Sequence, residues 1–108
     1  FSAMQNAYAE GHHPVLCGAP AVICIAGPKS NMQRKDDCVC AEQYLMLYAE
    51  SIGIASCING FTQIAHKEAE KYLGVPDTHV IEAVIMLGYP KYRYQKPVRY
   101  ETDVSWTE

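Results

Sequence analysis

The chain has 108 residues, of which 49% are hydrophobic and 19% are charged. This composition excludes an intrinsically disordered protein, because disordered segments lack the apolar side chains that a core needs. A chain of this length forms one domain or part of one. Its apolar runs are too short to span a bilayer, and no basic stretch followed by an apolar run marks a signal peptide. We therefore expect a cytoplasmic protein without a membrane segment.

The formal net charge of −3 hides a concentration of positive charge near the C-terminus. Four basic residues fall within nine positions that hold no acidic residue: Lys91, Arg93, Lys96 and Arg99. Removing this +4 from −3 leaves −7 for the other residues. Such a chain would repel a long polyanion, so the cluster indicates a compact anionic ligand such as a phosphate monoester and argues against nucleic acid. The alternatives are a solvated basic face and, from Tyr92-Arg93-Tyr94, a base-stacking platform.

The cysteines and histidines do not form a recognisable covalent or metal framework. The chain contains five cysteines, at Cys17, Cys24, Cys38, Cys40 and Cys57. An odd number without C-x-x-C spacing favours reduced, buried thiols in a reducing compartment. Cys38 and Cys40 would point to different sides of a helix and could not bind one ion together. No histidine has an Asp or Cys at ligand spacing, so no metal site is expected.

The first predicted elements are a helix and a strand. Phe1, Met4 and Tyr8 recur at helical spacing, which suggests that the chain opens inside a helix and that an N-terminal half precedes it. Residues 19–26 are apolar, rich in β-branched side chains and followed by Gly27-Pro28. They predict a strand that is buried on both faces.

A long helix is predicted next, capped by Asp36 or Asp37 and ending near Ser51. Its apolar residues cover most of the circumference. A helix of this kind is either central in its domain or shared with a second subunit.

After Gly53, residues 54–58 are predicted as a short extended link. A second helix is expected over residues 62–73, ending at Gly74, and a second buried strand over residues 80–88. The order of elements indicates an α+β (α/β layered) fold. Two strands do not make a stable sheet, so we expect further strands from sequence outside this chain or from a partner.

The C-terminal segment alternates large and polar residues over positions 100–106, the pattern of a half-exposed strand. No hairpin turn returns it to residues 80–88. We therefore expect this strand to be exchanged with a partner subunit. The alternative is a loose, solvated tail.

Six segments carry a family resemblance. They are Gly18–Ile23, the helix from Asp37 to Ala49, the link from Ile52 to Phe61, Leu73–Pro76, Leu87–Pro90 and Val104–Trp106. Their order and spacing resemble the nitroreductase family of FMN-dependent oxidoreductases. The basic stretch after Gly88-Tyr89-Pro90 is most similar to the branch whose members often carry an N-terminal ferredoxin-like iron–sulfur segment.

The resemblance implies a mixed sheet flanked by helices, in which residues 1–108 are the C-terminal portion of a single nitroreductase-like domain. It implies an obligate homodimer with FMN at the subunit interface. NAD(P)H or another donor would reduce the flavin, which would then reduce a nitroaromatic, quinone or similar acceptor. The flavin would carry the chemistry, in keeping with a chain that offers no acid–base or nucleophilic constellation.

The resemblance also assigns binding roles to five residues. The backbone N–H groups of Asn59 and Gly60 would reach the N5 and O4 edge of the flavin. Lys96 and Arg99 would bind the FMN phosphate, with Arg93 as a second candidate.

Several features depart from the family pattern, among them Asn59, which stands where other residues, including Glu, often occur. The family's upstream Arg-Arg-Ser-type phosphate motif has no counterpart here, and Tyr44 stands where Asn is common. Two other classes of function therefore remain: a non-catalytic interaction module that retains the fold, and a small-anion or nucleotide sensor.

Overall fold

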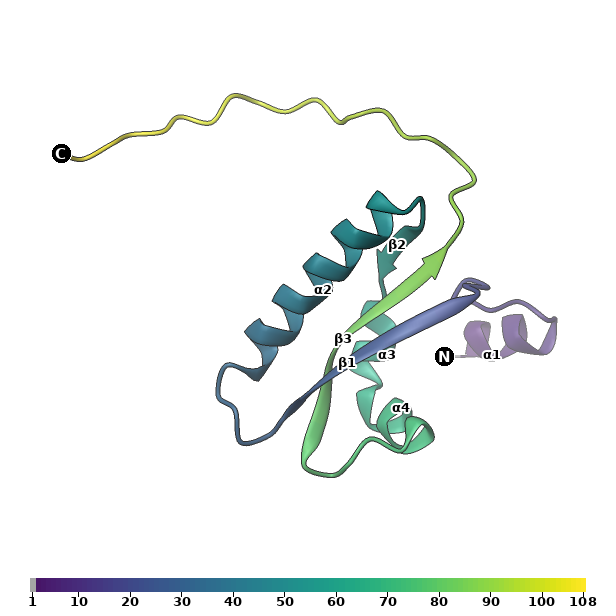
Figure 1. Ribbon diagram of the computed structural model, residues 1–108. Coiled ribbons are helices and arrows are strands. Elements are labelled where there is room, and N and C mark those ends of the chain that lie inside the picture. The colour runs from purple at the N-terminus through teal and green to yellow at the C-terminus, as the bar shows by residue number, and fades with distance from the viewer. Residues whose placement is uncertain (1) are drawn as a thin grey trace.

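The computed structural model describes residues 2–108 and is centred on a three-stranded antiparallel sheet with the strand order β1-β3-β2 (Figure 1). The strands are β1 (Ala21–Pro28), β2 (Ala55–Ile58) and β3 (His79–Gly88). The central strand is thus the last strand in the chain, and both earlier strands pair only with it. All pairs in the described sheet are antiparallel, so a parallel pair of the expected mixed sheet is not formed within residues 2–108, while the expected α+β arrangement of a sheet flanked by helices is confirmed.

Four helices accompany the sheet (Figure 1). They are α1 (Ser2–Ala9), α2 (Arg34–Ser51), α3 (Gly60–Ile64) and α4 (His66–Leu73). Alternate residues of a strand point to opposite faces of a sheet. In β1, Gly27 lies against α2, whereas Val22 and Cys24 line a hollow with α4. The helices α2 and α4 therefore cover opposite faces of the sheet.

The core is small and is formed mainly by β3. Four β3 side chains are at most 1% exposed: Ile81, Ala83, Val84 and Ile85. Helix α2 adds Cys38 and Ala49, each 5% exposed. A continuous apolar run in a central strand produces this burial on both faces, as the sequence predicted for residues 80–88.

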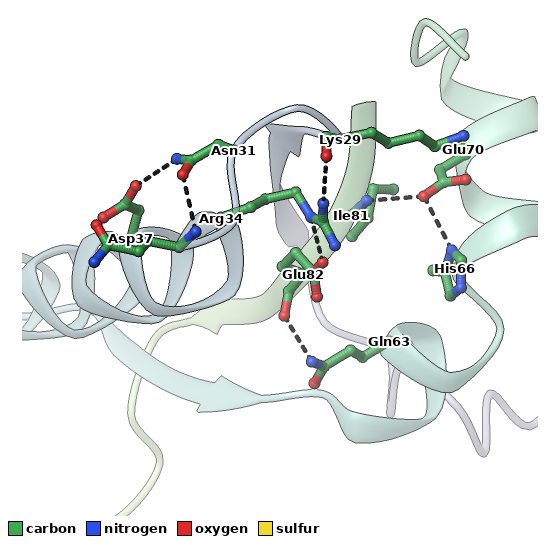
Figure 2. A network of polar contacts seen from close by, with 10 residues as sticks. Lys29, Asn31, Arg34, Asp37, Gln63, His66, Glu70, Ile81 and Glu82 are labelled. Atoms are coloured by element: carbon green, nitrogen blue, oxygen red, sulfur yellow. Dashed lines mark hydrogen bonds and ion pairs between the residues drawn. The ribbon is translucent and has the colours of Figure 1, made fainter. Parts of the chain in front are cut away.

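A β-bulge in β3 directs one charged side chain towards α2. Ala26 is opposite Ile81 and Ile25 is opposite Ala83, which leaves Glu82 as an extra residue on β3. Glu82 Oε1 accepts a hydrogen bond from Arg34 Nε at 2.6 Å, and this partly buried pair joins the start of α2 to the sheet (Figure 2). The ion pair explains how a glutamate is accommodated in a strand that is otherwise apolar.

The long helix begins earlier than expected. The first helical residue is Arg34, and no side chain caps its N-terminus. Asn31 instead accepts a hydrogen bond from the Gln33 N–H and donates one to Asp37, so Asp37 stabilises the turn before the helix (Figure 2). The expected cap at Asp36 or Asp37 is therefore wrong. Both acidic residues lie in the first turn, where negative charge interacts favourably with the helix dipole.

Two further expectations are corrected by the structure. Residues 54–58, expected as a link, contain the strand β2. The single helix expected over residues 62–73 is divided at Ala65 into α3 and α4. Gln63 of α3 donates to a β3 carbonyl at 2.6 Å, and Glu70 of α4 accepts a β3 N–H at 2.8 Å, so each helix has its own contact with β3 (Figure 2). The stop at Gly74 is confirmed by its left-handed φ of 67°.

The N-terminal helix is confirmed over Ser2–Ala9, while Phe1 lies outside the described residues. The expectation of buried cysteines is confirmed only for Cys38, since Cys17, Cys40 and Cys57 are exposed. All five thiols are free. Cys38 and Cys40 lie on different sides of α2, as helical geometry requires.

Much apolar surface of α2 has no cover within residues 2–108. Tyr44, Leu47 and Tyr48 are 77%, 61% and 64% exposed. The chain as a whole exposes 9362 Å², against about 6,000 Å² for a compact domain of this mass. Its radius of gyration is 17.4 Å, against about 13 Å for a compact domain of this length. The described chain is therefore not a closed globule.

Residues 89–108 contain no helix or strand and run away from the sheet as an extended tail that ends far from β3 (Figure 1). The strand expected over residues 100–106 is thus not formed within this chain. Among the described residues, no helix is long and apolar enough to cross a membrane.

Candidate functional site

The side chain of Asn59 connects three parts of the fold. It is 4% exposed and lies between β2 and α3. Its Oδ1 accepts a hydrogen bond from the Thr62 N–H at 2.8 Å, and this bond caps α3. Its Nδ2 donates to the Val15 carbonyl at 2.6 Å and approaches Met86 Sδ at 3.2 Å. The amide is therefore occupied by the protein itself, and its role is to fix α3 and the loop before β1.

The two backbone N–H groups assigned to the flavin edge differ in their availability. The Asn59 N–H donates to the Val84 carbonyl at 2.8 Å, so it is not free for a ligand. Gly60 is the first residue of α3, where a helix leaves its N–H without an intrahelical acceptor. A Cβ placed on Gly60 would meet no atom of the described chain within 4 Å. Of the pair, Gly60 is the residue whose N–H has no intrahelical acceptor, and it also has open space on its Cβ side.

The three basic residues assigned to phosphate binding lie on the exposed tail. Arg93 lines a hollow of about 900 Å³ with residues 53–56 and the first residues of the tail. Lys96 and Arg99 lie farther along the extended segment. The ion pairs of the described residues include none of the three, so their charges are not neutralised by this chain. The structure does not bring them into one hollow with Asn59 and Gly60.

A second hollow, of about 450 Å³, shares residues 55 and 56 and Tyr89 with the first. Its walls are residues 16–20, the strand β2 and the end of β3. The bond from Asn59 to Val15 holds the backbone immediately before this wall. Asn59 therefore shapes the hollow without lining it.

Glu42 is a buried acidic residue that the sequence did not single out. It lies on the buried face of α2, is 5% exposed, and its Oε1 has no hydrogen-bond donor among residues 2–108. Burial raises the pKa of the Glu42 carboxyl and, on the same face, the pKa of the Cys38 thiol. The signal in the sequence was an acidic residue four positions after Cys38, on the helix face that carries small apolar side chains.

The groups described above are hydrogen-bond donors and positive charges. A free backbone N–H beside open space and unpaired basic side chains can bind and orient an anionic, hydrogen-bond-accepting ligand. The raised pKa values of Glu42 and Cys38 disfavour the carboxylate and thiolate forms that bases and nucleophiles need. The basic side chains and the Gly60 N–H are thus suited to binding an anionic ligand.

Known proteins are similar to this chain in both sequence and fold. A family model described as "Nitroreductase family" matches residues 2–89. An Archaeoglobus fulgidus protein described as "Putative NADH dehydrogenase/NAD(P)H nitroreductase" is 32% identical over 94 residues, which cover 82% of this chain and 53% of that protein.

Among solved structures, an FMN-dependent nitroreductase from Clostridium difficile is 26% identical, with a TM-score of 0.64, and the match covers 74% of this chain and 51% of that one. A nitroreductase with bound FMN from Desulfitobacterium hafniense has a TM-score of 0.73 at 24% identity, covering 99% of this chain and 60% of that one. The chain therefore spans between about half and three fifths of the length of these relatives.

Proposed function

Because this chain belongs to the nitroreductase family, we propose that residues 1–108 are the C-terminal portion of an FMN-dependent oxidoreductase. The observation that carries the proposal beyond family membership is the position of Gly60: it is the first residue of α3, follows the hydrogen-bonded Asn59, and has open space on its Cβ side. A flat ring with acceptors along one edge fits such a position. The proposed site residues remain Asn59, Gly60, Arg93, Lys96 and Arg99. Asn59 would contribute by holding α3, and with it Gly60, in place.

The residues present fit FMN in two respects. The ring edge needs N–H donors and close backbone approach, which Gly60 offers. The phosphate needs positive charge, which Lys96, Arg99 and Arg93 offer without internal ion pairs. When bound, the flavin supplies the two-electron chemistry, and the chain supplies binding, orientation and electrostatics.

We infer that the whole protein is a homodimer in which each tail contacts the other subunit. Two observations support this. The α2 side chains Tyr44, Leu47 and Tyr48 are uncovered. The tail extends away from its own sheet and carries large apolar side chains, with Tyr100 at 95% and Trp106 at 89% exposure. Within one chain, Lys96 and Arg99 lie apart from Gly60. Exchange of the tail would explain this separation, because the two basic residues would then bind the phosphate of the flavin in the partner subunit.

The donor and acceptors are part of the same proposal. NAD(P)H is the proposed donor, in line with the name of the Archaeoglobus relative, and nitroaromatics, quinones or similar compounds are the proposed acceptors. The cytoplasm is the proposed location, and relationship to the ferredoxin-associated branch stays a prediction.

The direct test is to purify the full-length protein and identify any flavin that denaturation releases. We expect FMN at close to one per subunit and NAD(P)H-dependent reduction of a quinone. A colourless protein that neither binds added FMN nor oxidises NAD(P)H would contradict the proposal and favour a non-catalytic interaction module.

Substitution of Gly60 tests the placement of the ring. Gly60→Val should lower FMN affinity at least about tenfold, because the side chain would occupy the space and screen the N–H that the ring needs. The stability of the fold should change little, since the new Cβ meets no atom of this chain. Gly60→Ala, which adds one carbon, should give a smaller loss. Flavin titration and circular dichroism report the two effects, and a Gly60→Val protein with unchanged FMN affinity would refute the placement.

The phosphate contact is tested by comparing two flavins. Lys96→Ala/Arg99→Ala should weaken FMN binding by roughly 1.5–3 kcal/mol or more, the scale of one charged hydrogen bond, or about tenfold to a hundredfold. Riboflavin, which lacks the phosphate, should bind the variant and the parent equally. Lys35→Ala, a change of an exposed lysine on α2, is the control. Equal FMN affinity in the parent and the double variant would remove both residues from the site.

A further inference from the structure

A hollow of about 500 Å³ lies away from the residues assigned to the flavin, between α4 and the end of β1. Its walls are α4, the turn over residues 75–77, the first residues of β3, and Lys29 just after β1. It is lined by three lysines and two histidines, namely Lys29, Lys67, Lys71, His66 and His79. None of these residues belongs to the tail or to the segment around Asn59.

This accumulation of positive charge stands out against the composition of its surroundings. Residues 1–88 contain five Lys or Arg and nine Asp or Glu. One of the five, Arg34, is paired with Glu82. Three of the remaining four line this single hollow, although they come from two segments about 40 positions apart in the sequence.

One of the two acidic residues that line the hollow, Glu70, is already engaged. Glu70 Oε1 accepts the Ile81 N–H at 2.8 Å and lies 3.0 Å from His66 Nδ1. The Lys29 side chain extends over the same carboxylate (Figure 2). The Ile81 hydrogen bond, followed by the interaction with His66 and the charge of Lys29, lowers the pKa of Glu70. Glu70 therefore acts as a fixed carboxylate that ties α4 to β3 and positions His66.

The three lysines, Lys29, Lys67 and Lys71, have no ion-pair partner among residues 2–108. Lys67 and Lys71 are four positions apart on α4, so two like charges occupy one helix face, an arrangement that destabilises an isolated helix. Glu70 and Asp77 supply two negative charges, which leaves a net charge of +1 with neutral histidines and more when they are protonated.

We propose that this hollow binds a compact phosphate, either free or as the monoester of a small molecule. Three lysines line the hollow, and lysine ammonium groups commonly bind phosphate as point charges. The imidazoles of His66 and His79 add hydrogen-bond donors. The volume accommodates one small ester, and the acidic body around the hollow disfavours a long polyanion.

The test is calorimetric titration of the full-length protein with inorganic phosphate and, separately, with glycerol 2-phosphate at constant ionic strength. Lys67→Ala/Lys71→Ala should weaken the binding at this site about tenfold or more, because two charged hydrogen bonds are lost. Both side chains are exposed, so circular dichroism should not change, and the melting temperature should stay the same or rise slightly as the like-charge repulsion is removed. Preference for the ester over inorganic phosphate would identify a small-molecule monoester as the ligand, and equal affinity a free phosphate.

Two controls separate this site from the tail. Lys35→Ala should leave phosphate binding unchanged. Lys96→Ala/Arg99→Ala should abolish any binding to the tail and leave the proposed site intact. The proposal is overturned if the parent binds neither anion, if Lys67→Ala/Lys71→Ala binds phosphate like the parent, or if the tail variant alone loses all binding.

Discussion

Removal of residues 99–108 from the full-length protein is expected to turn a dimer into monomers that retain little FMN. The tail exposes Tyr100, Val104 and Trp106 at 95%, 63% and 89%, which is consistent with side chains that are covered only in an assembly. Burial of a large aromatic side chain removes about 150–250 Å² from water, worth several kcal/mol at about 25 cal/mol per Å². Loss of two aromatic contacts per subunit is therefore enough to dissociate a dimer of ordinary affinity.

Light scattering gives the mass, and FMN fluorescence gives the bound fraction. The deletion also removes Arg99, so a matched variant, Tyr100→Ser/Trp106→Ser, keeps every basic residue and should dissociate in the same way. Deletion of residues 107–108 alone should have no effect. A truncated protein that remains dimeric and as heat-stable as the parent would rule out exchange of the tail.

Substitution of Gly27 by valine is expected to lower the free energy of unfolding by about 3 kcal/mol. Gly27 is buried where β1 passes under α2, and any Cβ there would collide with the aliphatic part of Arg34 and lie 3.2 Å from Cys38 Sγ. Arg34 would have to move, and its hydrogen bond to Glu82 would be lost. Overpacking costs about 1–3 kcal/mol, and a charged hydrogen bond contributes about 1.5–3 kcal/mol.

Urea denaturation of the full-length protein measures the change. The control is a double-mutant cycle with Arg34→Ala, because valine at position 27 should cost less once the arginine side chain is gone. Additive effects of the two substitutions would show that Gly27 and Arg34 do not interact.

The sequence predicted elements well where local pattern determines structure. The strand over residues 80–88 and the end of α4 at Gly74 follow from apolar runs and from the backbone freedom of glycine. Prediction from the sequence failed where pairing with a segment distant in the sequence determines the local structure. Residues 55–58 form a strand because β3 pairs with them, and four residues with Ser56 and Cys57 among them carry a weak strand pattern.

Prediction of the site was limited in the same way. Asn59 was singled out only through the family resemblance, and its role as the cap of α3, a usual one for this residue type, was not predicted. Its bond to Val15 and the occupation of its own N–H by Val84 depend on segments far from it in the sequence. The hydrogen bond between Arg34 and Glu82 joins residues 48 positions apart in the sequence. The presence of a glutamate inside an apolar run was the only hint of it.

The position of β3 at the centre of the sheet has a consequence for biosynthesis. A ribosome produces β1 and β2 first, yet neither can pair before residues 79–88 have left the exit tunnel. Until then α2 has no sheet to cover, and its apolar side chains are accessible to chaperones and to other nascent chains. Closure of the β1–β3 pairing also joins segments about 55 positions apart, a non-local step of the kind that slows folding. Nascent chains arrested before residue 79 should therefore be protease-sensitive throughout, and resistance should appear in one step once β3 has emerged.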